Sequence, residues 1–195
     1  MVFEKEIFLR ALCNYSKHQI KNGTSIPAAV LIPLFKAEWQ YHILFTKRTD
    51  KVETHKGEIS FPGGVFDKTD KNLLDTALRE SNEELGIDIR DVDVLGELDD
   101  IETNTNFIIS PFVGIIPYPY EFKVNEAEIE KLLLVPLEHL LNKDSFWEES
   151  WRYKGAPYPM YFYRYENNII WGATAKIVKH FLEIIERTQG ENPKS

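Results

Sequence analysis

Three glutamates within a five-residue stretch, Glu80, Glu83 and Glu84, have the types and spacing in this sequence that best suit chemistry. On an α-helix they would share a sector about 100° wide. Like charges at positions 80 and 84 cost an isolated helix about 0.2 to 0.5 kcal/mol, so the cluster favours a bound cation. Divalent cations such as Mg²⁺ prefer oxygen ligands. A solvated acidic helix face is the alternative interpretation.

The helix that must position these glutamates is predicted over residues 73–85. Its neighbouring sector carries small and apolar residues that predict a buried face, namely Leu74, Ala77, Leu78, Ser81 and Leu85. Gly86 is a candidate C-cap for this helix. Upstream, Gly63 and Gly64 lack side chains, which would let backbone groups approach a metal ion or a phosphate closely.

The segment from Gly64 to Ile87 resembles the Nudix box, whose general pattern is G-x5-E-x7-R-E-U-x-E-E-x-G-U, with U an apolar residue. Residues 79–87 read Arg-Glu-Ser-Asn-Glu-Glu-Leu-Gly-Ile and keep this register. The segment departs from the pattern at three points. The distance from Gly64 to Arg79 is one residue longer, Asp70 stands where the first Glu is expected, and Ser81 occupies a usually apolar position.

The resemblance implies a fold and a reaction. The fold is an α/β class, Nudix-type α/β/α sandwich with a mixed central sheet, and the reaction is hydrolysis of a nucleoside diphosphate linked to another moiety, with Mg²⁺ or Mn²⁺. It implies Glu80 and Glu84 as principal metal ligands and Glu83 as a further ligand or the base that activates water. Arg79 would orient a glutamate, and the Gly63 carbonyl would complete the metal shell.

A second resemblance concerns the substrate. The stretch from residue 44 to residue 64 is similar to the motif of coenzyme A pyrophosphatases, roughly L-L-T-x-[RT]-[SA]-x3-R-x3-G-x3-F-P-G-G. The residues that carry the similarity are Leu44-Phe45-Thr46-Lys47-Arg48-Thr49, His55, Gly57 and Phe61-Pro62-Gly63-Gly64. The similarity implies cleavage of coenzyme A or a derivative to 3′,5′-ADP and 4′-phosphopantetheine. Arg48, His55 and Gly64 would then contact substrate, although His55 also fits a plain exposed loop residue.

Two alternatives stay open. Glu53 stands where that motif has an Arg, which favours another nucleoside diphosphate, such as ADP-ribose or a dinucleotide, as substrate. A non-catalytic Nudix-fold module that binds a nucleotide or a protein is the alternative of another class, because fold alone does not settle function. The retained glutamates at positions 80, 83 and 84 argue against this second alternative.

Two further groups have more ordinary interpretations. Glu128 is flanked by Glu126 and Glu130, which favours a solvated helix start over a functional acid. An aromatic-rich stretch could line an adenine or pantetheine pocket but is more often core; it comprises Trp147, Trp151, Tyr153, Tyr158, Tyr161, Phe162 and Tyr163.

The remaining elements predict one Nudix domain over residues 1–195, with an N-terminal helix within 1–22 packed on it and the box in 57–87. Strands are expected at 28–35, 41–47, 92–98, 107–116, 158–165 and 168–171. One or two short helices, interrupted at Pro136, are expected over 125–141, and a closing helix over 173–187.

The overall charge excludes some partners. With 23 basic and 31 acidic residues the net charge is −8, so a general nucleic-acid binder is not expected. No apolar run reaches the roughly 18 residues of a membrane span, and no secretory h-region is evident. The single cysteine, Cys13, suits a reducing compartment, so a cytoplasmic protein is expected, with a homodimer as an open alternative to a monomer.

Overall fold

The computed structural model describes residues 3–13, 15–50, 56–153 and 155–190 of the chain. Its elements, in chain order, are α1 (Lys5–Cys13), β1 (Ile26–Ala37), β2 (Gln40–Arg48), β3 (Ile59–Ser60), β4 (Gly63–Val65), α2 (Leu73–Leu85), η1 (Ile89–Asp91), β5 (Asp93–Glu97), β6 (Ile101–Glu102), β7 (Phe107–Ile115), β8 (Ile129–Pro136), α3 (Leu137–Leu141), η2 (Lys143–Ser145), β9 (Phe146–Tyr153), β10 (Ala156–Tyr165), β11 (Asn168–Trp171) and α4 (Gly172–Gly190). None of the helices in these ranges is both long and apolar enough to span a bilayer.

An eight-stranded mixed sheet forms the centre of the molecule, as expected. β1 pairs in parallel with β7 and antiparallel with β2 at one end and β4 at the other. The order along the sheet is β3-β2-β1-β7-β5, while β8 also pairs with β2 and β6 with β7. The central position of β1 explains its largely apolar sequence, because it is covered on both faces.

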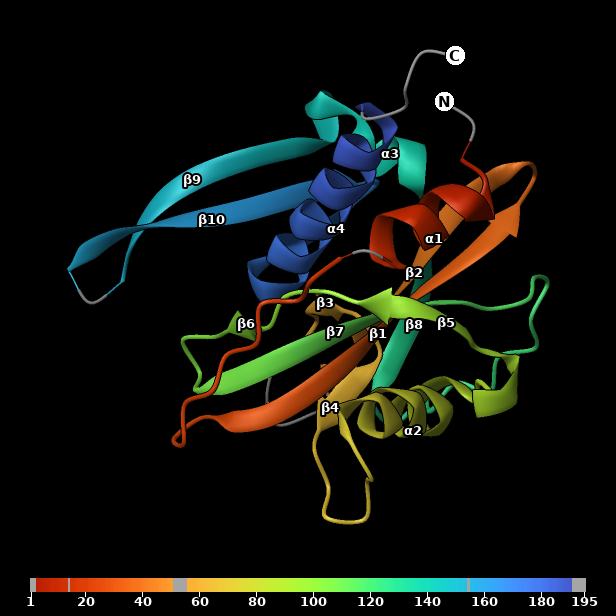
Figure 1. Ribbon diagram of the computed structural model, residues 1–195, viewed down its shortest axis with the longest axis horizontal. Coiled ribbons are helices and arrows are strands. Elements are labelled where there is room, and N and C mark those ends of the chain that lie inside the picture. Colours follow the sequence, from red (N-terminus) through yellow and green to blue (C-terminus); the bar gives the residue numbers. More distant parts are fainter. Residues whose placement is uncertain (1–2, 14, 51–55, 154, 191–195) are drawn as a thin grey trace.

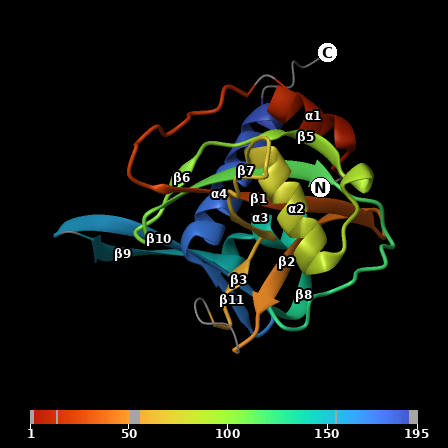
Figure 2. The same cartoon turned by 90° about the horizontal axis from the view of Figure 1, so that it is seen from below.

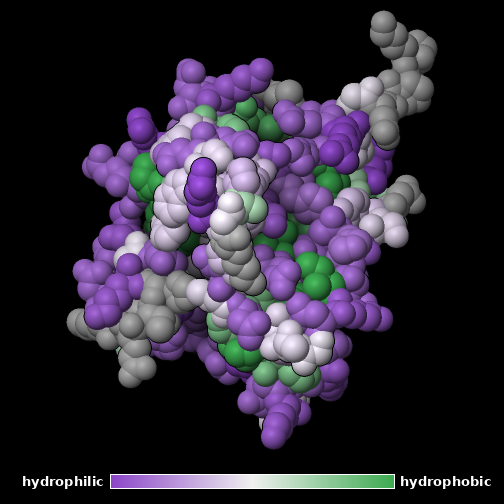
Figure 3. All heavy atoms as spheres, turned by 90° about the vertical axis from the view of Figure 1, so that its left-hand side faces the viewer, coloured by the Kyte–Doolittle hydropathy of each residue, from purple (hydrophilic) through white to green (hydrophobic). Residues whose placement is uncertain are grey.

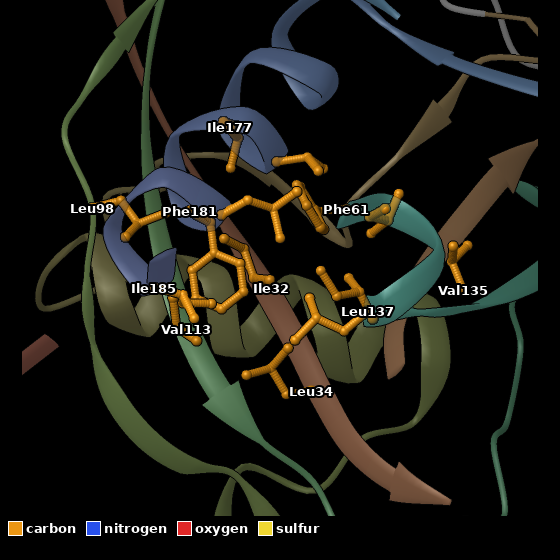
Figure 4. Packing of buried hydrophobic residues seen from close by; sticks show 14 of the residues in the cluster. Ile32, Leu34, Phe61, Leu98, Val113, Val135, Leu137, Ile177, Phe181 and Ile185 are labelled. Carbon is orange, nitrogen blue, oxygen red and sulfur yellow. The ribbon is translucent and has the colours of Figure 1, made fainter. Parts of the chain in front are cut away.

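Helices cover both faces of this sheet, with α1 and α4 on one side and α2 on the other (Figures 1 and 2). Successive side chains of a strand point to opposite faces. Ile32 and Leu34 of β1 accordingly join the core beneath α4, where Phe181 packs (Figure 4). Ala29 and Leu31 instead face α2, where they pack against two buried residues of that helix, Ala77 and Leu78. The α/β/α sandwich is confirmed.

The acidic helix α2 has the bounds that its sequence predicts, Leu73–Leu85. Asn72 caps its start, where the side chain accepts a hydrogen bond from the Asp75 amide at 2.9 Å. Gly86 ends it in the left-handed conformation with φ of 67°, a backbone geometry that glycine adopts without strain. Both ends of α2 are therefore fixed by local interactions.

A second, three-stranded sheet has the order β11-β10-β9. Its long β9–β10 hairpin projects from the body of the molecule (Figure 1). On the side that faces the viewer in Figure 3, hydrophilic residues prevail and hydrophobic residues show only as separate patches. Strands β10 and β11 match the expected late strands, whereas β9 was not predicted.

The N-terminal helix is shorter than expected. It ends at Cys13 rather than running toward residue 22. Asp99 accepts hydrogen bonds from the Tyr15 hydroxyl at 2.6 Å and the His18 amide at 2.7 Å, and Asp100 accepts one from the Ile20 amide at 2.9 Å. Because these carboxylates accept hydrogen bonds from backbone amides that a helix would otherwise use, residues 15 to 22 form an irregular strap along the β5–β6 turn.

The helical prediction for residues 125–141 was wrong over most of its length. Residues 129–136 form strand β8, which pairs antiparallel with β2, and only Leu137–Leu141 are helical. The leucine run at 132–134 favours helix locally, but pairing with an existing strand overrides that weak preference.

Candidate active site

The three glutamates of α2 lie in different environments. The Glu84 side chain is only 6% exposed and the Glu80 side chain 19%, whereas that of Glu83 is 58% exposed. Positions 80 and 84 are one helical turn apart and share the side of α2 that faces the Gly63–Gly64 segment and Arg48. The structure therefore separates two shielded carboxylates from a third at the solvent boundary.

Glu84 is a buried acid whose negative charge is only partly compensated by neighbouring groups. Burial raises its pKa to about 8, and the opposing positive charge of Arg48 lowers it only in part. The Arg48 Nη1 and Glu84 Oε1 atoms are 3.8 Å apart, and the Gly63 backbone also lowers the pKa of this carboxyl slightly. Within the described part of the chain, Glu84 Oε2 is buried without a hydrogen-bond partner. Such an orphaned oxygen is costly unless a further group binds it.

The glycine pair fits closely around this acidic site. A Cβ atom on Gly64 would lie 2.5 Å from the Glu80 Cδ atom, and one on Gly63 would lie 2.3 Å from the Ala29 carbonyl oxygen. Real Cβ contacts are never that short, so a larger residue at either position would force a displacement. The missing side chain of Gly64 therefore lets β4 lie against the Glu80 carboxylate, and that of Gly63 lets β4 lie against β1.

The Arg79 guanidinium uses all its N–H donors to connect Val65 and Asp70, which precede α2, with two glutamates of α2. Its guanidinium makes a two-point contact with Asp70, from Nε at 2.9 Å and from Nη2 at 3.2 Å, and Nη2 also reaches the Val65 carbonyl at 3.2 Å. Nη1 donates to Glu80 at 2.6 Å and to Glu83 at 3.2 Å. Arg79 is thus placed to orient two glutamates, the contact that the Nudix resemblance implies.

Asp70, a departure from the box pattern, has a clear structural place. Its carboxylate lies almost fully buried and accepts hydrogen bonds from Arg79 and from the Thr76 hydroxyl. The Arg79 guanidinium holds the pKa of Asp70 well below its usual range. The shorter aspartate side chain at position 70 thus reaches the Arg79 guanidinium directly.

Glu128 joins the site, contrary to the preferred interpretation of its sequence. It lies just before β8 rather than at a helix start, and its Oε2 atom is 3.7 Å from Arg48 Nη2. Burial is the main reason that the pKa values of Glu80 and Glu84 are raised, and the negative charge of Glu128 adds to this effect. The Asn125 side chain orients it through a hydrogen bond at 3.1 Å. Only the pairing of β8 with β2 brings this residue next to α2.

The donor set fits a divalent cation at Glu80 and Glu84. Their oxygens are hard ligands, one of them is buried and unpaired, and the cluster has excess negative charge. Across residues 3–13, 15–50, 56–153 and 155–190, no three acidic, histidine or cysteine side chains are already gathered into a metal-binding group. Binding would therefore bring the Glu80 and Glu84 carboxylates closer together around the cation, while Glu80 Oε1 keeps its contact with Arg79.

A cavity of about 460 Å³ opens beside this acidic cluster. Arg48, Gly63 and Gly64, which the sequence predicts as substrate or metal contacts, line one part of it. The other walls come from β10, the β6–β7 loop, the end of β11 and the start of α4, and include Tyr158, Met160, Tyr161, Thr103, Asn104, Thr105, Trp171, Thr174 and Lys176. The aromatic stretch thus supplies cavity wall as well as core. His55 and Glu53 lie outside the described residues.

Comparisons with known proteins agree with this geometry. The family model described as NUDIX domain matches residues 25–154. The protein named "Uncharacterized Nudix hydrolase NudL" in Photorhabdus laumondii is 35% identical over 159 residues, covering 82% of this chain and 84% of its own length. The protein of the same name in Yersinia pestis is 35% identical over 162 residues, covering 83% and 81%.

The solved structures show the same fold. The MutT protein from Methanosarcina mazei has a TM-score of 0.50 at 19% identity, covering 93% of this chain and all of its own. A MutT/nudix family protein from Enterococcus faecalis has a TM-score of 0.52 at 13% identity, covering 86% of this chain and 64% of its own.

The α/β/α sandwich, the acidic helix and these matches together define the class of this chain. It is a class of hydrolases whose members generally use divalent metal ions. The chain belongs to the Nudix family, and the relatives most like it among those above are Nudix hydrolases named NudL.

Proposed function

We propose that this Nudix hydrolase cleaves the diphosphate of coenzyme A or a derivative, giving 3′,5′-ADP and 4′-phosphopantetheine. The observation that carries the proposal is the continuity of the acidic cluster with the cavity: Arg48 contacts Glu84 and Glu128 and also lines the cavity. The resemblance of residues 44–64 to the coenzyme A pyrophosphatase motif supports the choice of substrate.

The proposed roles follow from the contacts around α2. Glu80 and Glu84 hold a divalent cation, Mg²⁺ or Mn²⁺, while Arg79 keeps the Glu80 and Glu83 carboxylates in place. When bound, such a cation offsets diphosphate charge and lowers the pKa of water. Glu83 and Glu128 are the more exposed acids beside it and are the candidates to accept a proton from the attacking water. Water adds to one phosphorus, the bridging P–O bond breaks, and two phosphate monoesters leave.

The cavity has a chemistry that suits the rest of such a substrate. Phe61, Tyr158 and Trp171 offer apolar and aromatic surface for an adenine ring or a pantetheine arm. Arg48 and Lys176 are the basic side chains in its lining, and Thr103 to Thr105 and Thr174 add hydroxyl and amide groups. Glu58 and Glu102 also line the cavity, so its described lining has no net positive charge, and the phosphates of the substrate would depend on the bound cation for charge compensation.

The second candidate substrate class is another nucleoside diphosphate, such as ADP-ribose or a dinucleotide. The sequence feature that favours it is Glu53, which replaces the arginine of the coenzyme A motif with a carboxylate. A carboxylate would repel a 3′-phosphate rather than bind it. The aromatic cavity would serve either substrate class.

A panel of substrates distinguishes these candidates. Coenzyme A, dephospho-coenzyme A, ADP-ribose and diadenosine polyphosphates are each incubated with the protein and Mg²⁺, and products are separated by chromatography. We expect coenzyme A to have the highest kcat/KM and to yield 3′,5′-ADP. Faster cleavage of ADP-ribose or a dinucleotide would replace the proposal with the second class. Nucleotide binding without any product in Mg²⁺ or Mn²⁺ would support a non-catalytic module.

A further inference from the structure

Strand β9 is an open sheet edge. It is the outer strand in the order β11-β10-β9, and no other strand in the described part of the chain pairs with its far side. Its residues from Glu148 through Tyr153 are all exposed. An edge strand presents its backbone amides and carbonyls to any strand of complementary register, and proteins usually shield such edges.

Three of the usual shields, namely proline, a bulge and a covering element, are missing from β9 as the structure describes it, whereas charged residues are present as Glu148, Glu149 and Arg152. Its eight residues contain no proline, and its pairing with β10 continues from Phe146 to Tyr153 without a bulge. The two prolines of this hairpin, Pro157 and Pro159, both lie in β10. The hairpin also projects from the body of the molecule, and no helix among the described residues covers its projecting part (Figure 1). The open edge is therefore long, regular and accessible.

One face of β9 is aromatic. Trp147, Trp151 and Tyr153 alternate along it, and Trp147 stacks on Phe162 of β10 with ring centroids 5.0 Å apart. Trp151 is 47% exposed. Glu149 lies between the tryptophans and accepts both indole N–H groups, at 3.0 and 2.8 Å. The Glu149 carboxylate is thereby hydrogen bonded within the aromatic face, so it is not an isolated charge that would repel a pairing strand.

The charges of β9 are self-complementary in one antiparallel register. A two-fold axis through Ser150 places Glu148 of one copy opposite Arg152 of the other, and Trp147 opposite Tyr153. Opposite charges and aromatic pairs at facing positions stabilise a sheet. An axis through Glu149 would instead place two glutamates opposite each other. The two registers differ by a shift of two residues, which keeps the same side chains on each face, so the facing charges distinguish them and favour the first.

We propose that a second copy of this chain pairs antiparallel with β9, centred on Ser150, so that the two three-stranded sheets form one six-stranded sheet. The partner is specified by the self-complementary order of charges and rings along β9. The pairing would also brace the hairpin whose β10 strand supplies Tyr158 to Tyr161 of the cavity wall. This proposal is independent of which substrate the protein cleaves.

Charge reversal tests both the partner and the register. The molar mass of the full chain is measured by light scattering and sedimentation over about 1 to 200 µM. We expect a dimer for the unaltered protein. Glu148→Arg or Arg152→Glu should each weaken dimerisation at least tenfold, because like charges then face each other, and the double variant should restore it.

Glu121→Arg, a reversal at an exposed loop residue outside β9, is the matched control and should leave the dimer unchanged. Circular dichroism and thermal unfolding establish that each variant is folded. A monomer at 200 µM would overturn the proposal, as would a dimer that ignores both single reversals. Weakening by both single reversals without recovery in the double variant would overturn the register centred on Ser150.

Discussion

At the scale of single residues, the site depends on a carboxylate placed where its charge is poorly tolerated. Glu84 is buried, faces Glu80 and Glu128, and has Arg48 as a distant counter-charge at 3.8 Å. In the cation-free protein this arrangement favours the protonated acid, since burial disfavours charge. A divalent cation would reverse that preference. The unfavourable burial of the Glu84 charge fits a site that a bound cation completes.

The stability of the cation-free protein should therefore depend on Glu84 and pH. The folded-state pKa of about 8 lies above the ordinary value of 4.5. The folded state then binds the Glu84 proton more tightly, so the contribution of Glu84 to stability is full below about pH 4.5 and declines as the pH rises toward 8. Linkage sets the slope at up to about 1.4 kcal/mol per pH unit. Urea unfolding in chelator measures it, with Glu84→Gln expected to remove this contribution.

The matched control is Glu186→Gln, which removes an exposed glutamate from α4. It should keep the pH slope of the unaltered protein. Equal slopes in Glu84→Gln and the unaltered protein would contradict the assigned burial of this charge.

Arg79 should be irreplaceable by lysine. The guanidinium holds Asp70 by two contacts while also reaching Glu80 and Glu83. An ammonium group has no planar fork and cannot maintain these contacts together. We expect Arg79→Lys to lower kcat about 100-fold in saturating Mg²⁺, with KM changed less than threefold, because misplaced carboxylates impair the reaction more than substrate binding. Steady-state kinetics on the best substrate of the panel measures both.

Lys176→Arg, which keeps a positive charge in the cavity lining, is a suitable comparison and should retain activity within about threefold. A near-normal kcat in Arg79→Lys would show that the planar guanidinium group is not needed.

At the scale of elements, β4 and α2 must approach each other closely for the site to form. Gly64→Ala should disturb this approach, because the new Cβ would meet the Glu80 carboxylate at about 2.5 Å. Glu80 would move away from the cation position, and Mn²⁺ affinity should fall about tenfold or more. Mn²⁺ titration followed by electron paramagnetic resonance measures this without substrate. Gly23→Ala, where nothing lies within 4 Å, is the control and should bind Mn²⁺ normally.

Elements with strong local signals could be predicted from the sequence. Helix α2 has an apolar face at helical spacing and the Gly86 cap, and its predicted and observed bounds agree. Strand β8 could not be recognised in this way, because its leucines favour helix and only β2 makes it a strand. β9 lacks the buried and exposed alternation of a half-buried strand, since six of its eight residues are exposed.

At the scale of the whole molecule, a buried charge network fastens the N-terminal strap to the sheet. The Lys17 ammonium contacts Asp100 at 2.9 Å, and their side chains are only 10% and 3% exposed. Asp100 also accepts from Ser110 at 2.6 Å and from the Ile20 amide. These contacts join the residues before β1 to the β5–β6 turn and β7, so the strap is part of the folded domain.

Removing this acid should destabilise the entire domain. Asp100→Ala leaves buried donors of Lys17, Ser110 and Ile20 without their shared acceptor. We expect the free energy of unfolding to fall by about 3 kcal/mol. This is near the lower end of the cost of breaking a buried ion pair, because Glu97 still contacts Lys17. Urea unfolding followed by fluorescence measures the loss. A change below about 1 kcal/mol would show that the strap is held by other contacts.

The sequence predicts the acidic half of the site better than the cavity. Glu80 and Glu84 lie one turn apart on a single helix, so their spacing alone brings them together. Glu128 and Tyr158 reach the site from β8 and β10, far along the chain, and no local pattern predicts that approach. Their positions are set by how strands pair, which is a property of the complete fold.

Mn²⁺ binding to the protein without substrate tests the central claim most directly. The unaltered chain, Glu84→Gln, Glu80→Gln and the control Glu186→Gln are titrated with Mn²⁺ at pH 7.5, and free Mn²⁺ is followed by electron paramagnetic resonance. We predict saturable binding by the unaltered chain and the control, with at least a tenfold loss of affinity in each α2 variant. Equal affinity in all four proteins would contradict the assignment of Glu80 and Glu84 as metal ligands.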